Sequence, residues 1–340
     1  MERPLNRRTV LGLGVGAAAA AASGLIATPA QAEEAGADVT AAESAVAACD
    51  SIAWSYQRHS GRAGGKWNAH ISTVSPDGTR HLAVSHGSDE VLQALSVNKV
   101  PVAVAVLDKV DRGLISLDQQ VEVSAAIIIP DGDGMFRLDG AYPSMVTVGH
   151  ALAALLTISD DTAVRLSGLV APALEINEIL VAKGFPNTQV EPVANPNRFY
   201  LGTSTPREMH DLFNALVAGE LLSAGSTEYL LNLLRSPIAF TDGVRRNMSS
   251  DERARVATKA GWLNDERHEA GIMFDSAGAP VLTYSLFASG QGQPGNYGAT
   301  HPAVEARARM GRDFFDGIVE LPGVRAETFP IPEYEPSNGG

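Results

Sequence analysis

Segments with a strand pattern lie near both ends of the chain, and a long helical stretch separates them. Apolar and polar residues alternate in 67–74 and 80–85, with Pro76-Asp77-Gly78 as a turn signal between them. Three further strand-like segments precede a closing helix at 301–319; they cover 255–259, 268–274 and 281–289. The two ends are expected to form one antiparallel sheet, with the helical middle inserted as a layer of its own. We therefore predict an α+β (mixed α/β) fold.

The helical middle begins with an apolar run at 91–108. Ser88 or Asp89 is a suitable N-cap for this helix, and Gly113 is a suitable end. Further helices are predicted at 148–158, 162–169, 175–182, 206–218 and 226–234. Residues 190–205 contain Pro192 and Pro196 and have no periodicity, so we predict a long ordered loop there.

Composition excludes several classes of protein. With 45% hydrophobic and 6% aromatic residues, the chain is typical of a globular enzyme. The net charge of −13 argues against nucleic acid and anionic membranes as partners, which leaves a small-molecule substrate and a monomer as our expectation. Cys49 is the single cysteine, so no intramolecular disulfide can form. We expect no cofactor and no metal, since His268-Glu269 lacks a second histidine at zinc-binding spacing and Asp131-Gly132-Asp133-Gly134 is interpreted as a plain turn.

The first 32 residues have the pattern of an export signal. Asn6-Arg7-Arg8-Thr9-Val10-Leu11 is a twin-arginine sequence, and an apolar run follows it to Ala27. Ala30-Gln31-Ala32 then supplies small residues at cleavage spacing. We predict that residues 1–32 direct secretion from a bacterial cytoplasm by the twin-arginine pathway, without a membrane anchor. A structural helix is the alternative.

A hydroxyl and an amine lie three residues apart in the first apolar run. At helical spacing, Ser96 and Lys99 share one face. A lysine among apolar side chains has a lowered pKa, so it can accept a proton and activate the serine as a nucleophile. The alternative is a capping serine and a lysine that extends to solvent.

Two other polar clusters favour the first interpretation. Ser159-Asp160-Asp161 follows an apolar helix, and Lys259-Ala260-Gly261 ends a predicted strand. The order Ser-x-x-Lys, Ser-Asp-x, Lys-x-Gly is the motif set of active-site serine penicillin-recognising enzymes. With these motifs, residues 67–315 resemble the class A β-lactamase-like serine hydrolases. The stretches that begin at Lys99 (KVPVAVAVLD), Thr203 (TSTPREM) and Arg267 (RHEAGI) are similar to that family as well.

The resemblance implies a five-stranded antiparallel sheet flanked by helices, with an all-helical domain inserted. The catalytic region would be 33–321, with a sheet domain at about 50–90 and 235–321, a helical domain at about 91–234, and a loose tail at 322–340. The active site of the family lies between the two domains. Its activity would be hydrolysis of a cyclic amide C–N bond, with β-lactam degradation and antibiotic resistance as the consequence.

Site roles also follow from the resemblance. Ser96 would be the nucleophile, Lys99 its general base, and Ser159 the residue that relays a proton to the leaving nitrogen. Lys259 would hold a substrate carboxylate, next to Ala260 and Gly261. The backbone N–H groups of Ser96 and Leu263 would hold the oxyanion.

Two departures from the family pattern lie within the second and third polar clusters. Asp161 stands where the family has Asn; an ionised Asp accepts hydrogen bonds but donates none, and it favours a charged Lys99. Ala260 replaces a Thr or Ser whose hydroxyl binds the substrate carboxylate. Both departures favour a non-lactam substrate for a peptidase, amidase or esterase. A slowly acylated binding protein or pseudoenzyme is a third hypothesis.

Glu191 favours the lactam hypothesis. The string Glu191-Pro192-Val193-Ala194-Asn195 matches the family pattern in which the Glu activates the water that clears the acyl-enzyme, and Asn195 would contact the substrate. The Arg and Asp that usually clamp this loop correspond to Gln189 and Gly202, so that ion pair is absent. The alternative role of Glu191 is a surface carboxylate before a turn proline.

Overall fold

The computed structural model describes residues 29–319, 321, 328–333, 335, 337 and 339, and the chain divides into two compact units. The first unit is 1–37, of which the start of helix α1 (Pro29–Ala63) is described. The second unit is 38–340 and contains all the other elements. The predicted export signal therefore lies mostly outside the described residues.

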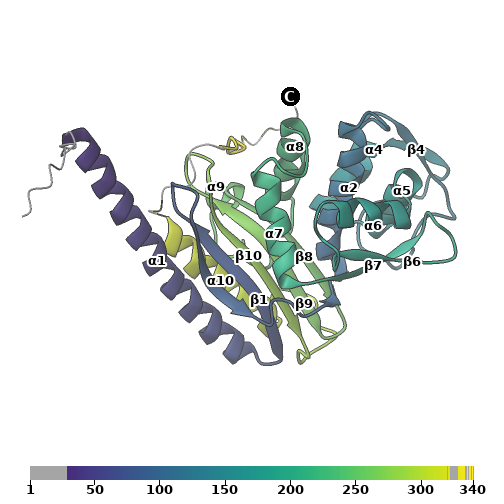
Figure 1. Cartoon of the computed structure of the whole chain (residues 1–340). Helices are drawn as coiled ribbons and strands as arrows, with labels where there is room; N and C mark the ends of the chain where they lie inside the picture. The colour runs from purple at the N-terminus through teal and green to yellow at the C-terminus, as the bar shows by residue number, and fades with distance from the viewer. Residues whose placement is uncertain are drawn as a thin grey trace, which may run out of the picture. The chain divides into compact units, whose positions relative to one another are not determined.

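One five-stranded antiparallel sheet joins the two ends of the chain, as predicted (Figure 1). Its spatial order is β2-β1-β10-β9-β8. The strands are β1 (Lys66–Val74), β2 (Arg80–His86), β8 (Val256–Leu263), β9 (Glu266–Phe274) and β10 (Pro280–Ser289). Tight turns join each hairpin, so consecutive strands pair antiparallel, and β1 then pairs with β10. Strand β8 is left at one edge of the sheet.

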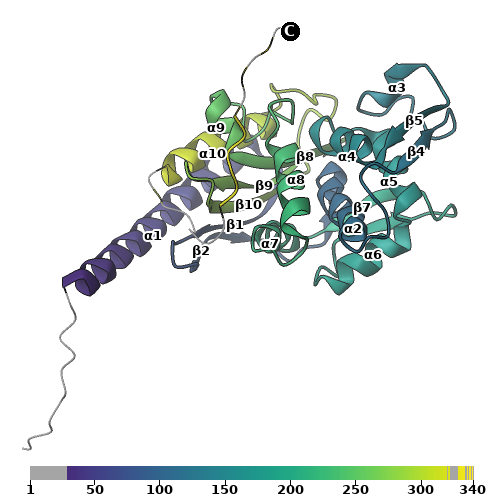
Figure 2. The same ribbon diagram turned by 90° about the horizontal axis from the view of Figure 1, so that it is seen from above.

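Helices cover both faces of this sheet (Figures 1 and 2). On one face, α1 and α10 (Pro302–Ile318) bury a cluster with the strands that includes Ile52, Tyr56, Phe314 and Phe315. On the other face lie α7 (Pro206–Val217) and α8 (Ala224–Arg235). Thr205 caps α7 through its side chain, as the Thr-Pro pair predicted.

The helical region packs beside the β8 edge around the buried helix α2 (Lys99–Asp111). Its other elements are β4 (Gln120–Val123), α3 (Phe136–Asp139), β5 (Ser144–Thr147), α4 (Val148–Thr157), α5 (Asp161–Val170) and α6 (Ala173–Ala182). A short helix, α9 (Ser250–Ala254), leads back into the sheet. Residues 100 and 102–107 are completely buried, which explains the uninterrupted apolar run.

Two sequence-based predictions of local structure are wrong. The first helix does not follow its predicted caps at Ser88 and Asp89: residues 92–93 form strand β3 (Leu92–Gln93), and a 3-10 turn η1 (Leu95–Asn98) precedes α2. Residues 190–205 are not a loop but a hairpin of β6 (Gln189–Pro192) and β7 (Phe199–Ser204), with β3 paired to β7. Both errors have one cause. Strand β3 forms by pairing with β7, and β7 pairs with both β3 and β6, so these short strands depend on pairing and not on local sequence.

The described part of the tail contacts the sheet near the end of β9. In the tail, the Phe329 N–H donates to the Gly278 carbonyl at 2.8 Å, and its ring contacts Phe274 edge-on. No helix among the described residues is both long and apolar enough to span a membrane.

Candidate active site

Ser96 lies in a tight turn pressed against strand β8. The residue before it, Leu95, has φ of 53°, a conformation that non-glycine residues adopt rarely. A Cβ atom added at Gly261 would lie 2.7 Å from the Ser96 backbone nitrogen, so only glycine permits this approach. Ser96 is partly exposed, and among the described residues its Oγ has no hydrogen-bond partner. The serine hydroxyl is therefore free to meet a ligand.

Lys99 is fully buried at the start of α2. Its Nζ donates to the Ser159 carbonyl at 2.5 Å, to Ser159 Oγ at 3.0 Å and to Asp161 Oδ1 at 2.8 Å. Burial lowers the pKa of Lys99, and Asp161 opposes that shift. The three N–H groups are all donated, and none of them to Ser96, so the resting arrangement is that of a charged ammonium.

Ser159 lies between two buried lysines. The Nζ of Lys259 also donates to Ser159 Oγ at 3.0 Å, and to the Ala260 carbonyl at 2.7 Å. Ser159 has φ of 58°, a strained conformation that costs about 1–3 kcal/mol and places its side chain between the two amines. Because both lone pairs of Ser159 Oγ accept from lysines, the hydroxyl hydrogen is left to donate to a third group.

Lys259 is fully buried on β8, and its pKa is lowered well below that of a free lysine, first by burial and then by Lys99. It lines a pocket of about 240 Å³ together with Ser159 and Trp262. Ala260 is fully buried and offers no hydroxyl there. A carboxylate bound in this pocket would thus depend on Lys259 for its positive charge.

Asp160 and Asp161 hold a loop that the sequence-based interpretation treated as a plain turn. Asp161 Oδ2 accepts from the Asp133 N–H at 2.9 Å, and Asp160 Oδ2 accepts from two N–H groups at 135 and 136. An added Cβ at Gly134 would lie 2.2 Å from Asp160 Oδ2, which explains the glycine. The pKa of Asp133 is raised, first by burial and then by Asp161. Asp133 also lines the pocket of Ser96, a role that its sequence pattern did not reveal.

Glu191 reaches the same pocket from the β6–β7 hairpin, where it is exposed and pairs with Tyr200. Asn195 is not among the pocket residues: its Oδ1 accepts from the Asn197 N–H at 3.0 Å in the hairpin turn. Asn98 links the hairpin to the start of α2, since its Nδ2 donates to the carbonyls of Leu201 at 2.6 Å and of residue 203 at 2.9 Å.

The pocket around Ser96 has a volume of about 430 Å³. Its polar lining residues include Ser96, Asp133, Asp161, Arg165 and Glu191. Trp262 and Leu263 close one side of it, from the end of β8. The structure thus brings Ser96, Lys99, Ser159, Asp161, Lys259, Gly261, Leu263 and Glu191 to one region between the sheet and the helical layer, whereas Asn195 points elsewhere.

Known structures share this fold. A β-lactamase from Sphaerobacter thermophilus superposes with a TM-score of 0.65 and 20% identity, covering 78% of this chain and 95% of that one. PBP-A and an ancestral class A β-lactamase each give a TM-score of 0.63 at 20% identity and cover 78% of this chain, and 95% and 99% of their own. The arrangement of sheet and helices is therefore that of β-lactamases and PBP-A.

Sequence comparison identifies the family. The model of the β-lactamase enzyme family matches residues 57–318. A β-lactamase of Rhodobacter capsulatus is 24% identical over 204 residues, which cover 58% of this chain and 68% of the relative. The chain belongs to the β-lactamase enzyme family.

Proposed function

We propose that the protein is an exported serine hydrolase that is acylated at Ser96 and hydrolyses β-lactams. The observation that carries the proposal is Ser159, whose Oγ accepts hydrogen bonds from both Lys99 and Lys259 at 3.0 Å. A hydroxyl held in this way is oriented as a proton donor, which is what a departing amide nitrogen requires. The family and the fold support a hydrolase of this kind.

Acylation would proceed by attack of Ser96 Oγ on the lactam carbonyl carbon. The new O–C bond forms and the ring C–N bond breaks. The proton of Ser96 passes to Lys99 once that amine is neutral. The Ser159 hydroxyl then gives its proton to the ring nitrogen and regains one from the Lys99 ammonium, whose Nζ is 3.0 Å away. Lys259 supplies positive charge for the substrate carboxylate and favours proton release near Ser159.

The register of β8 supports a proposal for the oxyanion donors. Leu263 and Glu266 flank a two-residue turn and are partners across β8 and β9. Residues in this position form a hydrogen-bonded pair, so the N–H of Leu263 is directed to β9. The N–H of Trp262 is then directed to the free edge near Ser96. We propose Ser96 and Trp262 as the oxyanion donors, in place of the pairing with Leu263 expected from the sequence.

The decisive experiment follows hydrolysis of a chromogenic cephalosporin together with the intact mass of the protein. Turnover with a transient acyl adduct supports β-lactam hydrolysis. An adduct without turnover indicates a slowly acylated binding protein. If neither is seen, a non-lactam peptidase, amidase or esterase becomes the better hypothesis, which the negative charge of Asp161 and the missing hydroxyl at Ala260 favour.

Glu191→Gln is expected to slow deacylation. Water must attack the acyl carbonyl to break the bond to Ser96 Oγ, and the Glu191 carboxylate is the proposed acceptor of the water proton. Loss of a general base lowers the rate about 10²–10⁴-fold, so turnover should fall while the acyl adduct accumulates. Exposed Glu178→Gln is the matched control and should behave as the wild type. Unchanged turnover in Glu191→Gln would remove this residue from the mechanism.

Asp161→Asn is expected to raise activity on lactams that carry an acylamino side chain. The amide gains a donor for the acylamide carbonyl, worth about 0.5–1.5 kcal/mol, or about 2–10-fold in kcat/KM. It also removes the charge that opposes the lowered pKa of Lys99. The activity should therefore appear at lower pH than in the wild type. A fall in kcat/KM at every pH would show that Asp161 serves a different substrate.

We also propose that residues 1–32 export the protein by the twin-arginine pathway. Replacing both Arg7 and Arg8 by Lys should retain the protein in the cytoplasm of the expressing cell, as measured by fractionation. Continued export of that variant would contradict this pathway.

A further inference from the structure

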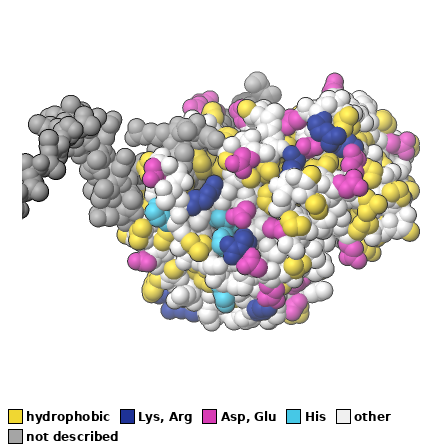
Figure 3. All heavy atoms as spheres, in the orientation of Figure 1, with side chains coloured by type: hydrophobic (Ala, Val, Ile, Leu, Met, Phe, Trp, Pro, Cys, Tyr) yellow, Lys and Arg dark blue, Asp and Glu magenta, His cyan; other side chains and the backbone are white. Residues whose placement is uncertain are grey.

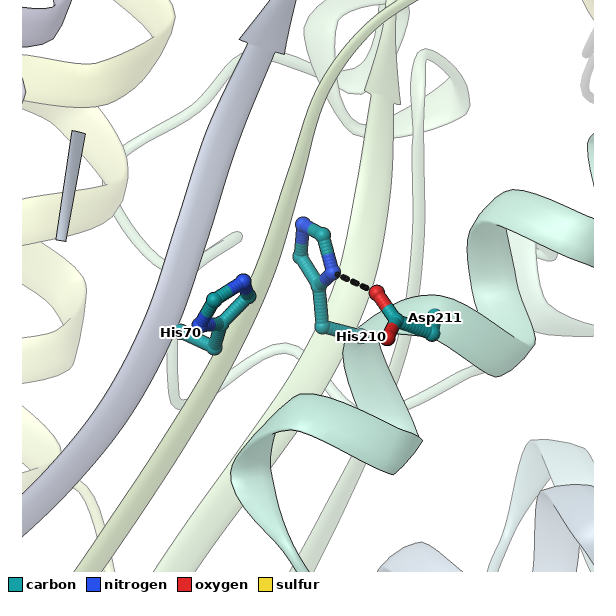
Figure 4. A group of neighbouring side chains, drawn as sticks. All are labelled: His70, His210 and Asp211. Atoms are coloured by element: carbon teal, nitrogen blue, oxygen red, sulfur yellow. Dashed lines mark hydrogen bonds and ion pairs between the residues drawn. The ribbon is translucent and has the colours of Figure 1, made fainter. Parts of the chain in front are cut away.

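Two histidines and an aspartate converge at a place that the proposed reaction does not use (Figure 4). His70 lies on β1, and His210 and Asp211 are neighbours on α7. One ligand atom of each residue lies within 4.8 Å of the other two. None of the three lines the pocket of Ser96. Two imidazoles and one carboxylate are a common ligand set for transition metals.

The surroundings of His70 leave one ring nitrogen available. Its Nδ1 is 3.1 Å from Ser88 Oγ, and the Ser88 hydroxyl donates to the Ala69 carbonyl at 2.9 Å. Ser88 Oγ must therefore accept from His70, which places the ring hydrogen on Nδ1. The Nε2 atom then has a free lone pair, oriented as the ring of a metal ligand is by its other nitrogen.

His210 is fixed from both sides of its ring. Its Nδ1 donates to Asp211 Oδ1 at 2.7 Å, and its Nε2 is 2.8 Å from Ser72 Oγ. The rings of His70 and His210 meet edge to face, with centroids 4.5 Å apart. Figure 4 shows the His210 ring directed at the Asp211 carboxylate and lying beside that of His70.

The charges around the cluster are nearly balanced. The positive charges of Arg207 and Arg80 lie close enough to the histidines to interact with them electrostatically. Arg207 also forms an ion pair with Asp89 at 2.6 Å. Asp211 adds a carboxylate that is half exposed. Figure 3 shows Lys and Arg side chains interspersed with Asp and Glu side chains on the face it draws.

We propose that His70 Nε2, His210 Nδ1 and an Asp211 carboxylate oxygen bind a divalent transition metal of the zinc class, with water as the fourth ligand. The metal takes the place of the hydrogen on His210 Nδ1. That proton leaves to solvent, while His210 Nε2 takes one up and donates to Ser72 Oγ, so the ring stays neutral. Ser88 and Ser72 then orient the two rings from behind.

A metal here would tie β1 to α7. Glu208, two residues before His210 in α7, accepts from the N–H of Asn187 at 3.0 Å and from the Thr188 hydroxyl at 2.8 Å, next to β6. Because a ligand that binds only the folded state stabilises it, the metal should raise the melting temperature. The site is expected to be structural and independent of the reaction at Ser96.

The test is a titration of the full chain, freed of metal by a chelator, with Zn²⁺ in competition with a chromophoric chelator. One equivalent should bind and raise Tm, and Co²⁺ should give visible bands of a four-coordinate site. His70→Gln and Asp211→Asn should each weaken binding at least about 10-fold. Exposed His150→Gln is the matched control and should bind as the wild type. Because Asp211 is half exposed, its variant is expected to fold even if the His70 variant does not. Failure of the wild type to bind one equivalent, or equal binding by Asp211→Asn, would overturn the proposal whether or not the protein hydrolyses lactams.

Discussion

Ser96→Ala is expected to abolish the acyl adduct and to lower turnover by about 10⁴–10⁶-fold, because it removes the proposed nucleophilic oxygen. The hydroxyl makes no hydrogen bond to another described residue. The substitution should therefore leave the melting temperature unchanged. Hydrolysis rate, intact mass and thermal unfolding of the same preparation separate a lost nucleophile from a damaged fold.

The control for Ser96→Ala is Ser116→Ala. Ser116 is exposed and is not one of the residues that line the pocket of Ser96. Its side chain makes no hydrogen bond to another described residue. Its variant should keep wild-type turnover and the same adduct. Adduct formation that persists in Ser96→Ala would place the nucleophile elsewhere, and the proposed mechanism would fail with it.

The sheet and the three polar clusters could be predicted because their signals are local. Alternation and tight turns define each hairpin, and antiparallel pairing then brings the last strands beside the first. The clusters of Ser96, Ser159 and Lys259 lie at the ends of elements. Their meeting follows from the order of elements, so the contacts of Ser159 with both lysines agree with the motif set.

Features that depend on contacts between distant segments could not be predicted. Strand β3 forms because Leu92 pairs with Ser204, and the apolar run alone is equally consistent with a helix. Asp133 reaches the pocket because Asp161 accepts its N–H across 28 residues. The approach of His70 to His210 joins residues 140 positions apart, which no motif spacing reveals.

The position of Asn195 shows the limit of a short motif. The string from Glu191 to Asn195 matches the family pattern, yet the hairpin turn separates its two ends. Glu191 is on β6 and lines the pocket, whereas Asn195 caps the turn through the N–H of Asn197. Residues that match a motif in spacing point in the same directions as in the family only when the backbone also has the same conformation as in the family.

The resting contacts of Lys99 explain why its removal is expected to be nearly as damaging as that of Ser96. Lys99 donates all three N–H groups to Ser159 and Asp161, so it must lose a proton before it can accept one from Ser96. Burial lowers its pKa and Asp161 opposes this. The fraction of neutral amine rises as the pH rises through that lowered pKa, and so should the acylation rate.

Lys99→Met keeps a long side chain in the buried position and removes the proposed base. Acylation should fall by about 10³–10⁴-fold, and the remaining rate should no longer rise with pH in the range where the wild type does. Stopped-flow mass measurement of the adduct at several pH values reports both effects. Exposed Lys66→Met, which disrupts only a surface ion pair with Glu90, is the control and should keep the wild-type pH profile. If Lys99→Met keeps that profile as well, another group must accept the proton of Ser96. The neighbouring Lys259–Ser159 pair then becomes the candidate, because burial lowers the pKa of Lys259 too.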